Sequence, residues 1–426
     1  MLFQRIKPID QIIATAEKKS LTRQLGAFQL TMLGIGAIIG TGIFVLTAEA
    51  GQKAGPGMMI AFVIAAVVCA FAALAYAELA SMVPVAGSAY TYTYGVLGEG
   101  VAWVVGWALV LEYTIAASTV CVGWAGYVNG LLSHAGFGLP QFLQVGPMDG
   151  GSFNLLACLI GLAITFLLVV GTSKSAKVNT VLVLIKIVAL TVFIFVALPA
   201  VKDQNFTPFV PNGWGSPMGG IGVLGAAASI VFAYIGFDAI STAAEETKNP
   251  NRNIPIALIG SLSVCTIYYL LVSYGAVGAV GAQPMLGPDG VALEPGTPAF
   301  AAACQGSQAL VCSKEALAHV VRLLDHNTMA AFIAFAAGIA LPSVILTMTY
   351  GQTRIFYTMA RDGLLPRVFA TVHPRFKTPW VNTILVAMIV AAAAGFFDIN
   401  TLGDMTSDGT LAAFGIVCLT VVWLRR

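Results

Sequence analysis

The chain has 426 residues, of which 58% are hydrophobic and only 9% carry a charge. Soluble domains usually contain about 25% charged residues, so this composition excludes an ordinary soluble globule. The net charge of +2 by itself says little about partners and gives no reason to expect a nucleic acid. We therefore expect an all-α polytopic membrane protein.

Apolar stretches divide the chain into predicted membrane spans, since a helix needs about 20 apolar residues to cross a bilayer core. They cover residues 28–48, 58–82, 100–132, 154–171, 176–198, 220–244, 254–280, 328–361, 380–397 and 402–424. We expect one transmembrane domain over 1–426, with a cytoplasmic tail (1–27), two five-helix repeats (28–200 and 220–426) and a long outward loop (281–327). An odd number of spans per repeat inverts the second copy, as in alternating-access transporters.

The positive charges predict the orientation, because cytoplasmic loops are enriched in Lys and Arg. With a cytoplasmic N-terminus, most of the 21 basic residues fall on the cytoplasmic side. The exceptions are Lys53, Lys202, Lys314 and Arg322 in outward segments, and Lys186 inside a span. We expect both termini to be cytoplasmic, in the plasma membrane or, in a bacterium, the inner membrane.

The first predicted span contains GIGAIIGTGIF (34–44), with glycines at 34, 36, 40 and 42. Each glycine lowers helix stability by about 1 kcal/mol relative to alanine, so we expect the helix to open here. Unwound backbone inside a membrane must be satisfied by protein, water or a ligand. The alternative is that these small residues let another helix pack closely.

Lys186 lies about ten residues into the fifth predicted span, hence about 15 Å deep at 1.5 Å per residue. An unpaired charge at that depth costs about 3 kcal/mol or more. We interpret Lys186 as a protonatable group in the place of a bound metal cation, with a lysine that reaches an interface as the alternative. Glu112 in the third span either lines a pocket or satisfies polar neighbours.

The sixth predicted span contains FAYIGFDAIS (232–241), with Asp238 well inside an apolar segment. A second break at the matching position favours a substrate site. The half-helix after the first break begins near Thr41 and Gly42, where free N–H groups suit a carboxylate. The first half of the sixth span ends near 232–235, where free carbonyls suit an ammonium. Together the two ends fit the backbone of an amino acid.

Two of the seven cysteines, Cys304 and Cys312, lie in the predicted outward loop, whereas the others lie in apolar spans. The outward side is oxidising in most cells, so we predict a disulfide between them. The alternative is a pair of free thiols in a flexible loop.

Motifs for enzymatic chemistry are missing from the sequence. The four histidines lie in loops without ligand-like spacing, and there is no HExxH, P-loop or Ser/His/Asp arrangement. We therefore expect neither an enzyme nor a bound metal or cofactor.

Several motifs occur in order along the chain: GAIIGTGIF (36–44), PVAGSAYTY (84–92), FAYIGFDAIS (232–241), EETKNPNRNIP (245–255) and YGQTRIFYTMARDGLLP (350–366). Together they resemble the amino acid/polyamine/organocation transporters, and most nearly the cationic amino acid transporters, over essentially the whole chain. The resemblance implies a LeuT-like fold with five-plus-five inverted repeats and broken first and sixth helices. Members usually have twelve or more spans, whereas ten are predicted here.

The resemblance also implies roles for individual residues. The substrate carboxylate is expected at Thr41 and Gly42, beside Gly40. The substrate ammonium is expected at the backbone carbonyls of Ile38, Phe232, Ala233 and Ile235. Lys186 matches a lysine that occupies the place of a sodium ion in sodium-independent relatives, and Ser343 is expected to face it.

We therefore expect a proton-coupled amino acid symporter that works by alternating access, with an amino acid, a proton and the lipid bilayer as its partners. Asp238 and Glu112 would favour a cationic side chain, while small neutral amino acids fit equally well. An amino acid exchanger and a non-transporting amino acid sensor are the alternatives.

Overall fold

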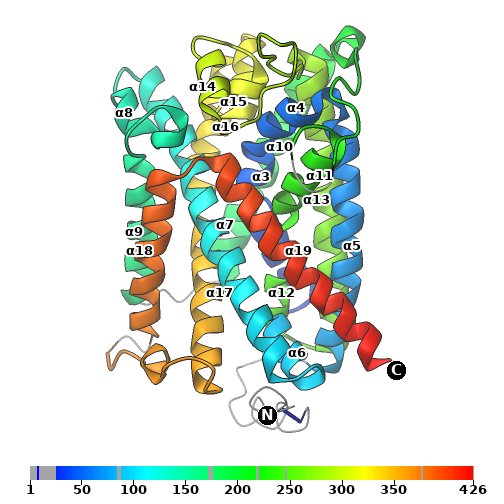
Figure 1. The fold of residues 1–426 in the computed structure, drawn as a ribbon, viewed down its shortest axis with the longest axis vertical. Coiled ribbons are helices and arrows are strands. Elements are labelled where there is room, and N and C mark those ends of the chain that lie inside the picture. The colour runs from blue at the N-terminus through cyan, green and yellow to red at the C-terminus, as the bar shows by residue number, and fades with distance from the viewer. Residues whose placement is uncertain are drawn as a thin grey trace.

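The computed structural model describes residues 7–8, 25–83, 88–170, 176–216, 220–244, 247–375 and 378–425 (Figure 1). Within these residues the chain is helical, and extended segments meet only at two isolated bridges. This confirms the predicted all-α class. Most of the predicted tail (1–27), and residues 84–87 and 245–246 of the quoted motifs, lie outside the described residues.

Seven helical stretches in the described residues are long and apolar enough to cross a membrane. Three of them are single helices: α7 (Glu99–His134), α13 (Pro250–Val280) and α19 (Ile399–Leu424). The other four stretches, Leu46–Met82, Asn179–Ala200, Val223–Thr242 and Asn327–Arg361, each combine shorter elements. These elements are, in order, α4 (Leu46–Ala54), η1 (Gly55–Gly57) and α5 (Met58–Met82); α10 (Ala176–Ala197) and η3 (Leu198–Ala200); α11 (Val223–Tyr234) and α12 (Ala239–Thr242); and α16 (Asn327–Ala340) and α17 (Pro342–Arg361). Three shorter apolar helices accompany them: α2 (Ala27–Ile38), α9 (Leu155–Val170) and α18 (Trp380–Phe396). The chain is a multi-pass membrane protein.

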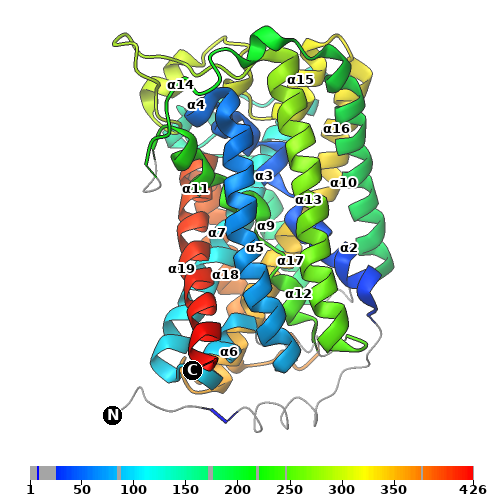
Figure 2. The same cartoon turned by 90° about the vertical axis from the view of Figure 1, so that its right-hand side faces the viewer.

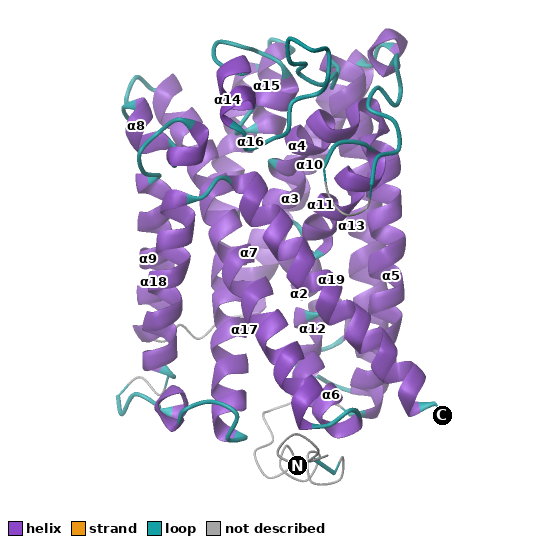
Figure 3. Ribbon diagram, viewed as in Figure 1, coloured by secondary structure: helices purple, strands orange, loops and turns teal. Residues whose placement is uncertain are grey.

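The helices run between two ends of the molecule, and loops gather at both (Figure 3). One end carries α8 (Gln141–Gln144), α14 (Pro298–Ala303) and α15 (Ala316–Leu323), and is called the α14 end below. The other carries α6 (Ser88–Val96) and the C-terminus, and is called the α6 end (Figure 2). The interrupted helices α2, α3 (Thr41–Phe44) and α11 run through the middle, packed against α5, α7, α13, α17 and α19.

The first predicted span is interrupted twice. Helix α2 ends at Ile38, residues 39–40 are not helical, and the four-residue α3 is separated from α4 by a turn at Val45. Helix α4 is polar, and the chain leaves it at Gly55, whose φ of +60° suits glycine, to enter α5. The glycines at 34 and 36 stay inside α2, so the break falls later than the glycine density alone indicates.

The sixth predicted span is interrupted beside the first. Helix α11 ends at Tyr234, residues 235–238 are not helical, and α12 follows with four residues. Gly236 has a φ of +115°, and a Cβ there would lie 2.8 Å from the carbonyl carbon of Ala37. Only glycine allows this approach of the unwound segment to the last turn of α2. Both predicted breaks are confirmed.

The loop predicted to face outward, 281–327, contains more regular structure than its Gly, Pro and Gln content indicates. It contains α14 and α15, and α15 buries Leu317, Val320 and Val321 at helical spacing. An amphipathic helix can pack one apolar face on the protein while its other face meets water. The composition of the loop hid this short periodic segment.

Gly42 lets α3 lie directly against α11, because a Cβ there would overlap Ala233. We expect Gly42→Ala to lower stability by about 1–3 kcal/mol through overpacking. The measurement is the thermal unfolding midpoint of the purified protein in detergent. Gly415→Ala is the matched control, since a Cβ at Gly415 meets no atom within 4 Å; equal midpoints for the two variants would contradict the close contact.

Candidate substrate site

A small enclosed space lies where the two breaks meet. Ile38, Gly40, Thr41 and Gly42 line it from the first break, and Phe232 and Ile235 line it from the second. Its remaining walls are apolar and come from α7 and α17: Ala116, Val120, Val344 and Met348. The volume is ≈ 10 Å³, room for about one water molecule, so the walls must separate before a larger solute can enter.

The start of α3 offers free hydrogen-bond donors to this space. The first N–H groups of a helix have no partner within it, and those of Thr41 and Gly42 are of this kind. The Thr41 hydroxyl is fully buried and has no hydrogen-bond partner among the described residues. These donors match the place where a substrate carboxylate is predicted, and that role remains a prediction.

Three of the four carbonyls predicted for the substrate ammonium, those of Ile38, Phe232 and Ala233, already have partners. The Tyr269 hydroxyl of α13 lies 3.0 Å from the Ile38 oxygen and 2.9 Å from the Ala233 oxygen, so it bridges the two breaks. The Phe232 carbonyl accepts from the Ile235 N–H at 3.2 Å. A carbonyl oxygen has two lone pairs, so each can still accept a second hydrogen bond.

Tyr269 was missed by the sequence analysis. The available signal was a tyrosine in the middle of an apolar predicted span, since a buried tyrosine hydroxyl usually has a partner.

The two acids assigned to the site lie away from the enclosed space. Asp238 is buried, accepts a short hydrogen bond from the Tyr113 hydroxyl of α7, and accepts from the Gly236 N–H at 3.2 Å. It therefore holds the unwound segment of the sixth span in place. Glu112 is also fully buried, and its backbone N lies close to Gly409 of α19. Neither acid lines the enclosed space.

Lys186 is fully buried on α10, and its Nζ donates to the Gly36 carbonyl at 2.7 Å. Gly36 lies in the last turn of α2, where a carbonyl oxygen no longer has an N–H donor from the helix itself. Close packing makes the contact possible, since a Cβ at Gly36 would lie 2.5 Å from Val183 one turn before Lys186. In the described residues no carboxylate forms an ion pair with Lys186.

Ser343 forms its hydrogen bond within its own helix region, to the Ala340 carbonyl at 2.7 Å. The predicted pairing of Ser343 with Lys186 is not among the hydrogen bonds of the described residues, and it remains a prediction.

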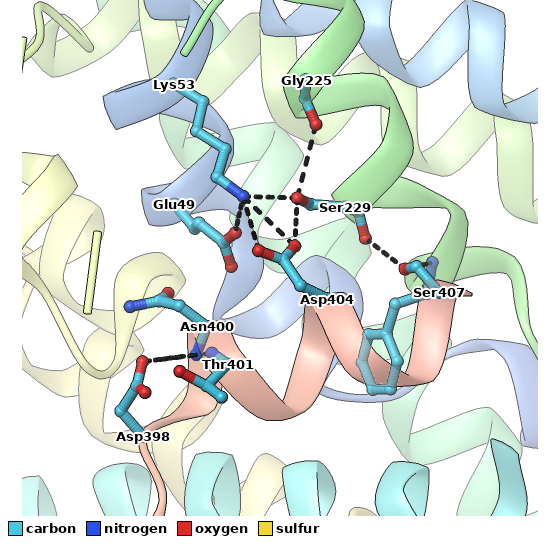
Figure 4. A network of polar contacts seen from close by, with 10 residues as sticks. Glu49, Lys53, Gly225, Ser229, Asp398, Asn400, Thr401, Asp404 and Ser407 are labelled. Carbon is cyan, nitrogen blue, oxygen red and sulfur yellow. Dashed lines mark hydrogen bonds and ion pairs between the residues drawn. The ribbon is translucent and has the colours of Figure 1, made fainter. Parts of the chain in front are cut away.

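Toward the α14 end, charged groups join three helices (Figure 4). Lys53 Nζ of α4 lies 2.7 Å from Glu49 Oε1 and 3.1 Å from Asp404 Oδ2 of α19, and 2.5 Å from Ser229 Oγ of α11. Ser407 of α19 donates to the Ser229 carbonyl at 3.1 Å and accepts from the Phe232 N–H at 3.2 Å. This network also escaped the sequence analysis, although an acid at position 404, inside the last predicted span, was a signal for it.

Further contacts between side chains lie at the two ends of the molecule. At the α6 end, Lys7 pairs with Asp362 at 3.1 Å, and the Tyr90 hydroxyl donates to the same carboxylate at 3.0 Å. At the α14 end, Cys304 and Cys312 form a disulfide.

Two helices interrupted side by side in the middle of a multi-pass bundle define a secondary transporter rather than an enzyme. The family described as amino acid permease matches residues 25–426. The chain therefore belongs to the amino acid permease family, which confirms the resemblance found in the sequence and the LeuT-like fold that it implies.

Curated relatives agree with this assignment. The branched-chain amino acid permease of Bacillus subtilis (strain 168) is 43% identical over 429 residues, which cover 100% of this chain and 86% of that protein. The methylthioribose transporter of the same strain is 40% identical, over 99% of this chain and 85% of that protein. A vacuolar cationic amino acid transporter of Arabidopsis thaliana is 36% identical, over 99% of this chain and 66% of that protein.

Removing the Tyr269 hydroxyl should loosen both breaks at once. We expect Tyr269→Phe to lower the free energy of unfolding by about 1–3 kcal/mol, because two buried carbonyls lose their shared donor. Thermal unfolding of the purified protein measures this. Tyr274→Phe is the control, since Tyr274 lies on the same helix with its ring exposed; a Tyr269→Phe midpoint equal to that of the control would contradict the bridge.

Proposed function

We propose that the chain is a proton-coupled symporter that takes up neutral aliphatic L-amino acids by alternating access. The observation that carries the coupling is the buried Lys186 ammonium, which donates to the first broken helix without a paired carboxylate among the described residues. A charge buried inside the membrane raises the free energy of the protein, and loss of the Lys186 proton removes that charge. The first break then carries the effect to the substrate site.

The cycle follows from the same contact. With Lys186 protonated, its ammonium holds the Gly36 carbonyl and so fixes the end of α2 beside the binding space. Deprotonation leaves a neutral amine, whose hydrogen bond to a carbonyl is weaker than that of an ammonium. The end of α2 is then released, which favours the conformation open to the other side.

The substrate class is proposed from the walls of the enclosed space. Ala116, Val120, Val344 and Met348 offer an aliphatic side chain apolar contact, while Asp238 is occupied by Tyr113 and Gly236. These features support a neutral side chain over a cationic one. The similarity to a branched-chain amino acid permease points the same way.

Orientation is proposed from charge and redox chemistry together. The disulfide supports placing the α14 end on the oxidising outer side, and the basic residues support a cytoplasmic α6 end. Uptake then runs from the α14 end toward the α6 end.

Lys186→Ala should abolish uptake driven by a proton gradient, because the group that links proton loss to α2 is gone. The measurement is uptake of labelled leucine into proteoliposomes under imposed proton or sodium gradients. Lys202→Ala, which removes a lysine from an outward loop, should keep the wild-type dependence on the proton gradient. Sodium-driven uptake that ignores pH, with full activity in Lys186→Ala, would refute the coupling; uptake that requires internal amino acid and ignores both gradients would indicate an exchanger.

Competition tests the substrate class. Unlabelled leucine, isoleucine and valine should each suppress uptake of labelled leucine, whereas lysine and arginine at the same concentration should leave most of it. The physical reason is the apolar wall, since burying an unpaired cation there is unfavourable. Stronger suppression by lysine or arginine, or by methylthioribose, would refute the proposed substrate class.

A further inference from the structure

A second, larger cavity lies at the α14 end, with a volume of ≈ 450 Å³. Val45 and Leu46, which follow α3 directly, are buried parts of its lining, whereas Gln141 and Lys314 are exposed parts. It shares no lining residue with the enclosed space between the breaks. Because Val45 and Leu46 follow α3 directly, this cavity lies on the α14 side of the first break.

Glu49 brings a carboxylate to the buried wall of this cavity. The residue is only 5% exposed and belongs to α4. Its Oε1 is ion-paired with Lys53 at 2.7 Å, while its Oε2 points away from Lys53 and has no hydrogen-bond partner among the described residues (Figure 4). A buried carboxylate oxygen without a donor is unfavourable, so a group that supplies one would bind there.

The nearby charges do not provide that donor. Lys53 is a single cation shared between Glu49 and Asp404. Lys314, on the cavity lining, is paired with Asp149 at 2.7 Å. The group formed by Glu49, Lys53 and Asp404 therefore holds one more carboxylate than it has cations.

The remaining acid nearby, Asp398, is not part of the cavity lining, and backbone groups match one of its two oxygens, while Oδ1 has no hydrogen-bond partner among the described residues. Asp398 Oδ2 accepts from the N–H groups of Asn400 and Thr401, at 2.9 Å and 3.3 Å, and so caps the start of α19. A carboxylate at this position is stabilised by the positive end of the helix. Among the described residues, Glu49 is therefore the acid on the cavity lining that has a buried oxygen without a donor.

We propose that this cavity is an outer binding subsite in which Glu49 binds the ammonium group of an incoming substrate before it moves to the breaks. This rests on the proposed function for the identity of the substrate. An ammonium offers three N–H donors and the missing positive charge, which is what Glu49 Oε2 lacks. The ammonium comes either from the α-amino group of any amino acid or from a basic side chain, and the two sources are separated below.

The experiment measures binding and uptake in one set of variants. Labelled 3-methylbutylamine, an ammonium with an aliphatic tail and no carboxylate, is bound to purified protein, and the KM for leucine uptake is measured in proteoliposomes. Glu49→Gln should weaken amine binding and raise the leucine KM about tenfold, with Vmax unchanged, because a charged hydrogen-bond partner is lost. Asp289→Asn removes an acid from the outward loop without touching the cavity lining, and should match the wild type.

Displacement of the labelled amine by other ligands identifies the chemical group that the site recognises. The carboxylate analogue 4-methylpentanoate should fail to displace the amine. If the site recognises the α-ammonium, leucine should displace the amine and Nα-acetyl-lysine should not. If Nα-acetyl-lysine displaces the amine and leucine does not, the site recognises a basic side chain. Lys53→Met should tighten amine binding, because it removes the cation that competes for Glu49; this opposite sign keeps the test decisive even where Glu49→Gln does not fold.

Amine binding and leucine KM unchanged in Glu49→Gln would overturn the subsite, as would weaker binding in Lys53→Met. A change in Vmax alone would assign Glu49 to a purely structural link between α4 and α19, which also overturns it. If the wild type binds the amine through Glu49 but takes up no leucine, the proposed function fails and the subsite stands.

Discussion

The structure depends on how the backbone groups at two interrupted helices are satisfied away from water. Inside a membrane an unpartnered N–H or carbonyl costs several kcal/mol, so a break persists only where side chains replace the lost hydrogen bonds. Lys186 donates to the Gly36 carbonyl and Tyr269 to those of Ile38 and Ala233, while Ser407 accepts from the Phe232 N–H inside α11 and so holds α19 against that helix. These partners come from α10, α13 and α19, and they tie the flanking helices to the breaks.

The two sides of the site therefore differ in how many of their backbone groups remain free to bind a substrate. The ends of α2 and α11 already have donors for their carbonyls, whereas the start of α3 keeps free N–H groups and an unpartnered Thr41 hydroxyl. A carboxylate would therefore meet donors with no competitor, and an ammonium would share its acceptors with Tyr269. The charged cluster at Glu49 and Lys53 lies farther out, toward the α14 end.

The sequence was sufficient to predict the class and the two breaks, because glycine density and a buried acid are local signals. Asp238 was found in this way, but its role was not, since Tyr113 lies 125 residues away. Lys186 was recognised from its depth, yet its acceptor, 150 residues distant, depends on how α10 packs on Gly36. The contacts of Tyr269 and the Lys53–Asp404 pair required the three-dimensional packing, because no periodicity along one helix indicates which helix lies opposite.

The contact between Gly42 and Ala233 has a mechanical consequence. With no side chain on Gly42, α3 lies directly against Ala233 at the end of α11, and neither helix end can tilt toward the other without a clash. The opposite wall of the space at the breaks comes from α7 and α17, so the space can widen without that clash where these two helices move away from it.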